Sequence, residues 1–321
     1  MVILLHIHSP TLSLTTACHD CFLSDLKEIP CMKIGNRIFE IELNPPPSEL
    51  QEVAKKELRE NPELQKESVA RLRELLKAEI DLKSPFHNDA WLIRFLRPCK
   101  YYPESSLQLI KQYYNFKARH SVFDNLKPSR EKNIFDQNIL TVLPIRDQYG
   151  RRMLVVEIGK KWKHNKCSLD EIFKGCVLYL EAAMLEPSTQ IAGAVVIFDM
   201  DGLTLQQAWQ FTPPFAKRLV DLLQEAMPLR IKNLHIVNQP YVFNMVFALF
   251  KPFLKEKFKS RIIFHGSDRK SLHGYISPKC LPANYGGTLD VPLIDGPTWY
   301  KMLIQCEKEY EAINEYGYKK K

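Results

Sequence analysis

Apolar side chains recur at helical spacing in a charge-rich stretch that runs from Ser48 to about Glu79. Within it, Asn61-Pro62-Glu63 has the order of a helix start: a capping residue, a proline at the first helical position and an early acidic residue. The apolar positions that follow are Val69, Leu72, Leu75, Leu76 and Ile80. Two further stretches, Asp89–Leu96 and Pro103–Phe116, repeat the helical pattern. We therefore expect a small all-helical domain over about 48–125.

The pattern changes after Lys127-Pro128, where short apolar runs rich in β-formers alternate with helical stretches. The runs are Met153–Ile158, Ala192–Phe198, Leu234–Val237 and Arg261–Phe264, and the helical stretches lie at about 168–186, 212–226 and 241–258. This alternation is typical of crossover units in a largely parallel sheet. Because the runs are nearly continuous rather than alternating, both faces of the sheet should be covered. The expected fold class is α/β, with this domain at 126–295 and a C-terminal helix and basic tail at 296–321.

Residues 1–47 differ from the rest of the chain because they lack helical periodicity, carry few charges and end in the triple proline Pro45–Pro47. We expect them to be disordered or loosely attached. Met32 is an alternative start of the protein, with the residues before it an upstream extension of the gene, and the pattern leaves both readings open. Cys18-His19-Asp20-Cys21 has the spacing of metal ligands, but no second Cys or His pair follows to complete four ligands. We interpret it as a chance occurrence and expect no metal site.

Composition says more about where in the cell the protein acts than about what reaction or ligand it has. No run reaches the eighteen or so apolar residues that a spanning helix needs, so membrane contact should be peripheral. Met1–Leu5 is too short and too poor in basic residues for a signal peptide. Eight irregularly spaced cysteines do not form a disulfide framework, which favours reduced thiols and a cytoplasmic protein. A formal net charge of +8 is compatible with an anionic partner, either a phospholipid headgroup or nucleic acid.

The common catalytic motifs are missing from the sequence. It contains no G-x-x-x-x-G-K-[ST], G-x-G-x-x-G, G-x-S-x-G or H-E-x-x-H. We therefore expect a binding protein rather than an enzyme, without catalytic residues and without a cofactor.

The segment Met227–Arg261 carries an aromatic stripe. Phe243, Phe247, Phe250 and Leu254 recur at helical spacing and form a larger apolar face than most surface helices have. Periodicity alone favours ordinary core packing, and the alternative is a movable lid over an apolar cavity.

Basic residues follow the stripe: Lys251, Lys255, Lys257, Lys259 and Arg261, with Glu256 as the single acid among them. In one helix, Lys251, Lys255 and Lys259 would share a face and repel one another. A solvated charged face is one explanation, and an anionic membrane is the other, because each basic residue near such a surface contributes about 1 kcal/mol. Nucleic acid fits less well, since the cluster is short and no RNA- or DNA-binding motif accompanies it.

Four motifs resemble those of the Sec14-like, CRAL-TRIO family and follow that family's order and spacing. They are Trp91–Arg97 (WLIRFLR), Ile197–Gly202 (IFDMDG), Pro228–Pro240 with its His235-x-x-Asn238, and Leu281–Gly287 (LPANYGG). The resemblance covers about 50–310 and is closest to the branch that includes α-tocopherol transfer protein and cellular retinaldehyde-binding protein.

This resemblance implies a helical module packed on an α/β domain that encloses a lipid between its sheet and a gate helix, here about Tyr241–Phe250. It therefore favours the lid interpretation of the aromatic stripe. By matching position, the pocket would be lined by Phe173, Cys176, Val177, Leu180, Ala194, Phe198, Leu219, Leu223, Met227, Phe243, Val246 and Leu249. Phosphoinositide headgroup contacts carry over to Arg230, Lys257 and Arg261.

Two departures from the family pattern concern this site. Relatives commonly have a basic residue two places after the equivalent of Arg97, whereas this chain reads Arg97-Pro98-Cys99-Lys100, so Lys100 is the candidate replacement. Serines occupy the positions of Cys176 and Leu180 in the tocopherol-binding protein. The pocket of this chain should therefore be drier, and a hydroxylated ligand is less expected.

The resemblance thus implies a monomeric cytoplasmic carrier of one tocopherol-, retinoid- or carotenoid-like lipid that acts peripherally at endosomal or plasma membranes containing phosphoinositides. Apolar pocket walls would replace the acyl chains that a lipid leaves behind, worth about 0.8 kcal/mol per buried CH₂. Two alternatives remain open: a phosphoinositide-regulated trafficking adaptor with a structural lipid, and an enzyme acting on a bound lipid.

Overall fold

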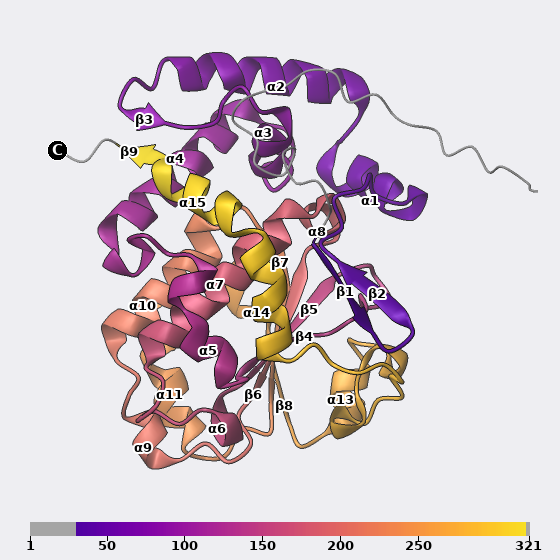
Figure 1. The fold of residues 1–321 in the computed structure, drawn as a ribbon, viewed down its shortest axis with the longest axis vertical. Helices are drawn as coiled ribbons and strands as arrows, with labels where there is room; N and C mark the ends of the chain where they lie inside the picture. Colours follow the sequence, from indigo (N-terminus) through magenta and orange to yellow (C-terminus); the bar gives the residue numbers. More distant parts are fainter. Residues whose placement is uncertain (1–29, 319–321) are drawn as a thin grey trace, which may run out of the picture.

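A five-stranded sheet forms the centre of the molecule (Figure 1). The computed structural model describes residues 30–318, so the expectations for residues 1–29, including the Cys18–Cys21 motif, lie outside the described residues. In spatial order the strands are β4 (Leu140–Val142), β5 (Arg152–Glu157), β6 (Ala194–Asp199), β7 (Ile231–Val237) and β8 (Ile262–Gly266). Strands β5 to β8 are parallel, and β4 pairs antiparallel with β5 at one edge. The predicted α/β fold with a largely parallel sheet is confirmed, and the four apolar runs are β5 to β8.

The two faces of the sheet have separate cores. Val156, Val196 and Ile236 belong to the larger core, which is covered by α7 (Leu169–Leu185), α10 (Pro213–Asp221) and α11 (Phe243–Phe250). Neighbouring strand residues such as Val155 and Val195 point to the other face, where α13 (Arg269–His273) and the buried Tyr285 cover them. Figure 1 shows α13 on the opposite side of the sheet from α10 and α11. Both faces are thus buried, as the continuous apolar runs predict.

A layer of helices precedes the sheet in the chain and lies across one end of it (Figure 1). These helices are α1 (Ser48–Leu58), α2 (Pro62–Lys77), α3 (Asp89–Leu96) and α4 (Pro103–Arg119). The predicted cap of α2 is present, because the side chain of Asn61 accepts a hydrogen bond from the Leu64 amide at 2.8 Å. The C-terminal strand β9 (Gly317–Tyr318) pairs with β3 (Leu82–Lys83) of this layer. The end of the described chain therefore packs on the helical layer.

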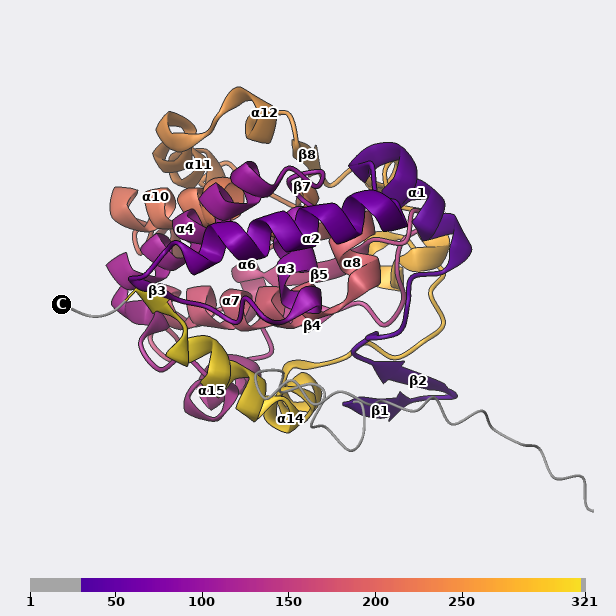
Figure 2. The ribbon, with the colours of Figure 1, turned by 90° about the horizontal axis from the view of Figure 1, so that it is seen from above.

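The remaining short elements complete the chain. They are α5 (Lys132–Asp136), α6 (Ile158–Lys161), α8 (Pro187–Ala192), α9 (Leu205–Ala208), α12 (Glu256–Lys259), α14 (Gly296–Gln305) and α15 (Glu307–Glu315). Figure 2 shows that α14 and α15 lie on the side of the molecule opposite α11 and α12. Within the described residues, no helix combines the length and the apolar character needed to cross a bilayer.

The expectation that residues 1–47 are disordered or loosely attached is wrong for residues 30–47. Strands β1 (Cys31–Ile34) and β2 (Arg37–Glu40) form a hairpin whose turn contains Gly35 at φ +57°, and Phe39 and Ile41 after it are buried. These strands of four residues are too short to produce a clear periodicity.

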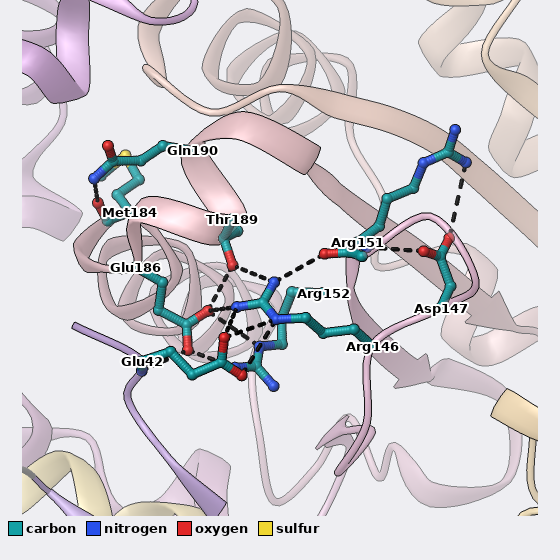
Figure 3. Close-up of polar contacts among 10 residues, drawn as sticks. Glu42, Arg146, Asp147, Arg151, Arg152, Met184, Glu186, Thr189 and Gln190 are labelled. Atoms are coloured by element: carbon teal, nitrogen blue, oxygen red, sulfur yellow. Dashed lines mark hydrogen bonds and ion pairs between the residues drawn. The ribbon is translucent and has the colours of Figure 1, made fainter. Parts of the chain in front are cut away.

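An ion-pair network fastens this segment to the α/β domain (Figure 3). Glu42 contacts Arg146 at 2.8 Å and Arg152 at 3.0 Å, and both guanidiniums also contact Glu186, at 3.0 and 2.5 Å. Burial alone would raise the pKa of Glu186, but Arg152 and Arg146 hold it below its usual value. Glu186 is therefore charged, and the network holds two cations against two anions.

The helix predicted over 241–258 is interrupted. It ends at Phe250, and a 3₁₀ turn at Lys251–Phe253 separates α11 from the one-turn α12. Pro252 explains the break because proline lacks the amide that a continuing helix needs. Lys251, Lys255 and Lys259 consequently do not share one helical face, which corrects that prediction.

Candidate functional site

An apolar cavity of about 120 Å³ lies between the sheet and the helices α7, α10 and α11. It sits mostly at the carboxyl ends of β5, β6 and β7, where Ile158, Met200 and Ile236 reach it. This is the end of a parallel sheet at which ligands commonly bind. Every side chain in its wall is apolar or, for Cys176, a thiol. Burial raises the pKa of Cys176 to about 12, so the thiol is neutral.

The cavity brings together the larger part of the predicted pocket. The predicted residues in its wall are Phe173, Cys176, Phe198, Leu219, Leu223, Phe243 and Val246. The whole aromatic stripe also faces it, because Phe247, Phe250 and Leu254 line the wall together with Phe243. Phe211 and Phe215 line it as well and were not predicted. Phe215 lies one turn before Leu219 in α10 and shares its spacing, but the pocket residues were assigned by matching position rather than by spacing.

Five predicted pocket residues lie elsewhere. Leu180 and Ala194 line a separate cavity of about 40 Å³ beside Trp299, because Ala194 starts β6 at the end opposite Phe198. Val177 is buried in the core outside the cavity wall, and Leu249 is half-buried off the stripe of α11. Met227 lines the groove described below.

Helix α11 separates this cavity from solvent. Its inner side chains Phe243 and Val246 are 5% and 3% exposed, whereas Met245 is 52% exposed and Tyr241, just before the helix, 89%. Phe264 of β8 is also exposed, and its ring packs edge-on against that of Phe247, with 4.9 Å between the ring centroids. The helix therefore has apolar side chains on both its cavity side and its solvent side.

A basic groove of about 650 Å³ opens on the other side of the segment that follows α10. Its cationic side chains are Lys100, Arg230, Lys232, Lys255, Lys257 and Arg261, and Glu225 is the acid in its wall. All four residues predicted to contact a phosphoinositide headgroup thus meet here, although they come from separate parts of the chain. Lys232 and Lys255 join them.

The cations of the groove crowd one another. Burial lowers the pKa of Arg261, and the nearby Arg230 lowers it further. Burial and Arg230 also lower the pKa of Lys232. Glu57 of α1 partly compensates: it pairs with Arg230 and, at 3.0 Å, with Lys232, and the hydrogen bond from Arg230 is the main cause of its own lowered pKa. An anion in the groove would relieve this repulsion.

Lys100 enters the groove from a tight loop after α3. Lys100 and Tyr101 both have left-handed backbone conformations, with φ of +52° and +59°. Such a conformation costs about 1–3 kcal/mol for a residue other than glycine. Burial of the Tyr101 ring and a 3.0 Å hydrogen bond from Ser68 Oγ to the Tyr101 carbonyl hold the loop. Lys100 thus lies where the sequence suggested a replacement for the missing basic residue.

The cavity and the groove share a wall. Leu223 and Phe258 line both. Leu223 belongs to a π-helical segment, Leu222–Ala226, a rare geometry that is frequently found at functional sites. In this segment Gln224 donates to the Phe253 carbonyl at 3.1 Å and accepts from the Lys255 amide at 2.8 Å. Glu225 adds an ion pair with Lys255 at 2.6 Å. These contacts fasten the chain that follows α11.

Metal-ligating side chains do not cluster in the described part of the chain: residues 30–318 hold no group of three or more His, Cys, Asp or Glu arranged to bind an ion. The only thiol in the cavity wall is that of Cys176. The arrangement offers apolar enclosure on one side and anion binding on the other.

Comparison with known proteins agrees with this architecture. Residues 136–287 match the model of the CRAL/TRIO domain. The chain is 36% identical over 284 residues to human alpha-tocopherol transfer protein-like. The matched region covers 85% of this chain and 82% of that protein. It is 33% identical over 269 residues to mouse clavesin-1, and this matched region covers 83% of this chain and 74% of that protein.

Proposed function

The chain belongs to the CRAL/TRIO family of lipid-binding proteins, and from this premise we propose that it carries one hydrophobic lipid and exchanges it at membranes containing phosphoinositides. The observation that supports this most directly is the shared wall: an apolar cavity and a basic groove meet at Leu223 and Phe258. One side encloses hydrocarbon, and the other attracts a phosphorylated headgroup.

The ligand is an isoprenoid-like lipid, such as a tocopherol, retinoid or carotenoid, with its hydrocarbon body in the cavity. The wall contains no hydrogen-bonding side chain other than the neutral thiol of Cys176. A hydroxyl or carbonyl placed deep in the cavity would lose its water without gaining a partner. The polar end of the ligand therefore lies toward the opening.

Loading requires α11 to move. Pockets for ligands of drug size measure about 300–1,000 Å³, whereas the cavity measures about 120 Å³. The exposed Tyr241, Met245 and Phe264 contact the apolar part of the bilayer when the protein docks, and α11 swings outward into it. The lipid then moves between two apolar surroundings and stays out of water.

The groove makes opening depend on the membrane. A headgroup can favour an open α11 only if it binds the open state more tightly than the closed one. Lys255 supplies that difference, because in the closed state its amide is held by Gln224 and its ammonium by Glu225. An anionic headgroup competes for Lys255 and weakens the attachment. The protein acts as a monomer, peripherally, at the cytoplasmic leaflet where anionic lipids concentrate.

Native mass spectrometry with organic extraction tests the carrier proposal on protein purified from a eukaryotic host. We expect one small lipid per chain, and faster transfer of that lipid to acceptor vesicles with phosphatidylinositol bisphosphate than to vesicles of phosphatidylcholine alone. A protein that binds the phosphoinositide vesicles but transfers no lipid would instead be a membrane-trafficking adaptor whose bound lipid is structural.

A further inference from the structure

A further cavity, of about 520 Å³ and called the second cavity below, lies away from both the apolar cavity and the small one beside Trp299. Helices α3 and α4, the end of α7, α8 and α15 enclose it, so it separates the helical layer from the α/β domain. It shares no wall residue with the apolar cavity. Its volume falls within the range of about 300–1,000 Å³ that is typical of pockets for small organic ligands.

The walls combine a large aromatic surface with a few polar groups. Trp91, Tyr113 and Tyr114 contribute rings, and the polar side chains in the wall are Asn88, Arg94, Arg97, Gln190 and Glu309. Apolar walls with few polar groups are what a site for an amphiphile requires.

Arg94 is the unusual member of this wall. It is 8% exposed, and its Nε has no hydrogen-bond partner among the described residues. Arg97, three residues later, differs because all three of its guanidinium nitrogens have partners. Its Nε and Nη2 donate to Glu60 at 3.0 and 2.8 Å, and its Nη1 donates to Gln190 at 2.5 Å. A guanidinium that is buried without such partners is costly, and a ligand anion offsets the cost.

Two acids lie near this guanidinium. Glu181 accepts a 2.5 Å hydrogen bond at its Oε1 from the hydroxyl of Tyr113, its Oε2 is buried without a partner among the described residues, and its side chain does not line the cavity. Glu309 lines the cavity, and burial and the nearby Glu181 raise the pKa of its carboxyl although Arg94 opposes the rise. Only the neutral form of Glu309 would donate to a ligand carboxylate, whereas the charged form would repel it.

We propose that this second cavity binds a small amphiphile with a carboxylate, whose anionic end pairs with Arg94 and whose apolar body lies against Trp91 and Tyr114. The site is independent of the carrier function and of the basic groove. A short or medium-chain fatty acid has the required chemistry.

Trp91 provides a local readout of this site. The matched probes are 8-bromooctanoate and 8-bromooctanol, which differ only in the charged end and quench a tryptophan that they contact. We expect saturable quenching by the acid in the full-length protein and loss of most of that quenching in Trp91→Phe. Quenching should persist in Val246→Arg, which blocks the apolar cavity, so failure here and failure of the carrier proposal are distinguishable.

Substitution of Arg94 decides whether the carboxylate is recognised. Arg94→Met should weaken binding of the acid about tenfold or more, because a charge-assisted hydrogen bond is lost, and should leave the alcohol unchanged. Glu309→Gln, which keeps the shape and removes an acid, should raise the ratio of acid to alcohol affinity, and it carries the test if Arg94→Met does not fold. Equal affinity for acid and alcohol in the unmodified protein, or quenching that survives in Trp91→Phe, would overturn the proposal.

Discussion

The apolar cavity and the basic groove lie on two sides of one short segment, and they differ in almost every property. The cavity is small, about 120 Å³, and its wall is apolar throughout apart from a neutral thiol. The groove is open, about 650 Å³, and gathers six basic side chains. The first therefore selects by shape and rejects any charge, whereas the second selects by charge and tolerates many shapes. Since only Leu223 and Phe258 belong to both, each can be disrupted without the other.

The largest effect should come from a charge placed in the cavity. Val246→Arg puts a guanidinium among apolar side chains, where an unpaired charge costs at least about 3 kcal/mol, equivalent to a hundredfold or more in ligand retention. Retention is measured as the fraction of co-purified lipid that survives gel filtration.

Met245 is the matched control for that experiment, because it is the neighbouring residue of α11 but is 52% exposed. Met245→Arg should retain lipid normally. Equal loss in both variants would mean that α11 is generally sensitive to charge and that the cavity does not hold the ligand.

Neutralising the groove should have the next largest effect, on vesicle binding alone. Lys100 and Lys257 line the groove from different segments, and each basic residue near an anionic surface contributes about 1 kcal/mol. The double variant Lys100→Gln, Lys257→Gln should bind phosphoinositide vesicles roughly thirtyfold more weakly. Lipid retention in solution should not change.

A pair of lysines on the far side of the molecule controls for net charge. Lys301 in α14 and Lys308 in α15 are exposed, and Figure 2 shows these helices on the side of the molecule opposite α12, which carries Lys257 of the groove. Their replacement by Gln should change vesicle binding little. A similar loss in both double variants would show that overall charge, rather than the groove, attracts the membrane.

Ionic strength should affect the groove and the cavity differently in the unmodified protein. Raising the ionic strength from about 0.1 M to about 1 M shortens the screening length from about 10 Å to about 3 Å. Vesicle sedimentation should fall about tenfold, since exposed charges are screened. Retention of lipid in the cavity should not change. A similar fall in lipid retention would contradict the proposal that the groove binds the membrane and the cavity holds the lipid.

The smallest effect is expected at the contact between the two sites. Gln224→Leu removes two hydrogen bonds to the chain after α11; at the low end of the usual range, about 0.5 kcal/mol each, their loss should accelerate lipid release about fivefold. Gln305→Leu is the control, because that glutamine bonds only within α14. An unchanged release rate in Gln224→Leu would mean that this contact does not restrain α11.

The sequence predicts the sheet and the helical layer well because both have strong local patterns. The runs that became β5 to β8 are almost uninterrupted apolar stretches, and Asn61-Pro62 marks the start of α2 within a residue. Strands β1 and β2 are too short for such a pattern. Pro252 is a local signal for the interruption after α11. It was overlooked because the aromatic stripe continues at helical spacing past it to Leu254.

The two sites differ in how far the sequence predicts them. The stripe Phe243, Phe247, Phe250 and Leu254 identifies one wall of the cavity by spacing alone. Position along an element is harder to judge: Leu180 lies two turns beyond Phe173 on α7, and that distance carries it to the other end of the sheet. The local basic run supplies Lys255, Lys257 and Arg261 of the groove, and it is visible in the sequence. The other cations, Lys100, Arg230 and Lys232, come from distant segments, so no local pattern joins them to the run, and Lys100 and Arg230 were predicted from the resemblance.

Glu42 makes the hairpin a counter-ion for the interior of the α/β domain. It is the only member of its network that comes from the segment before the triple proline, and it faces Arg146 and Arg152, which otherwise share Glu186. A protease that cut at Pro45–Pro47 and released the hairpin would leave two nearly buried guanidiniums with one carboxylate. The apparent boundary is therefore a poor place to divide this protein, because charge balance crosses it even though periodicity does not.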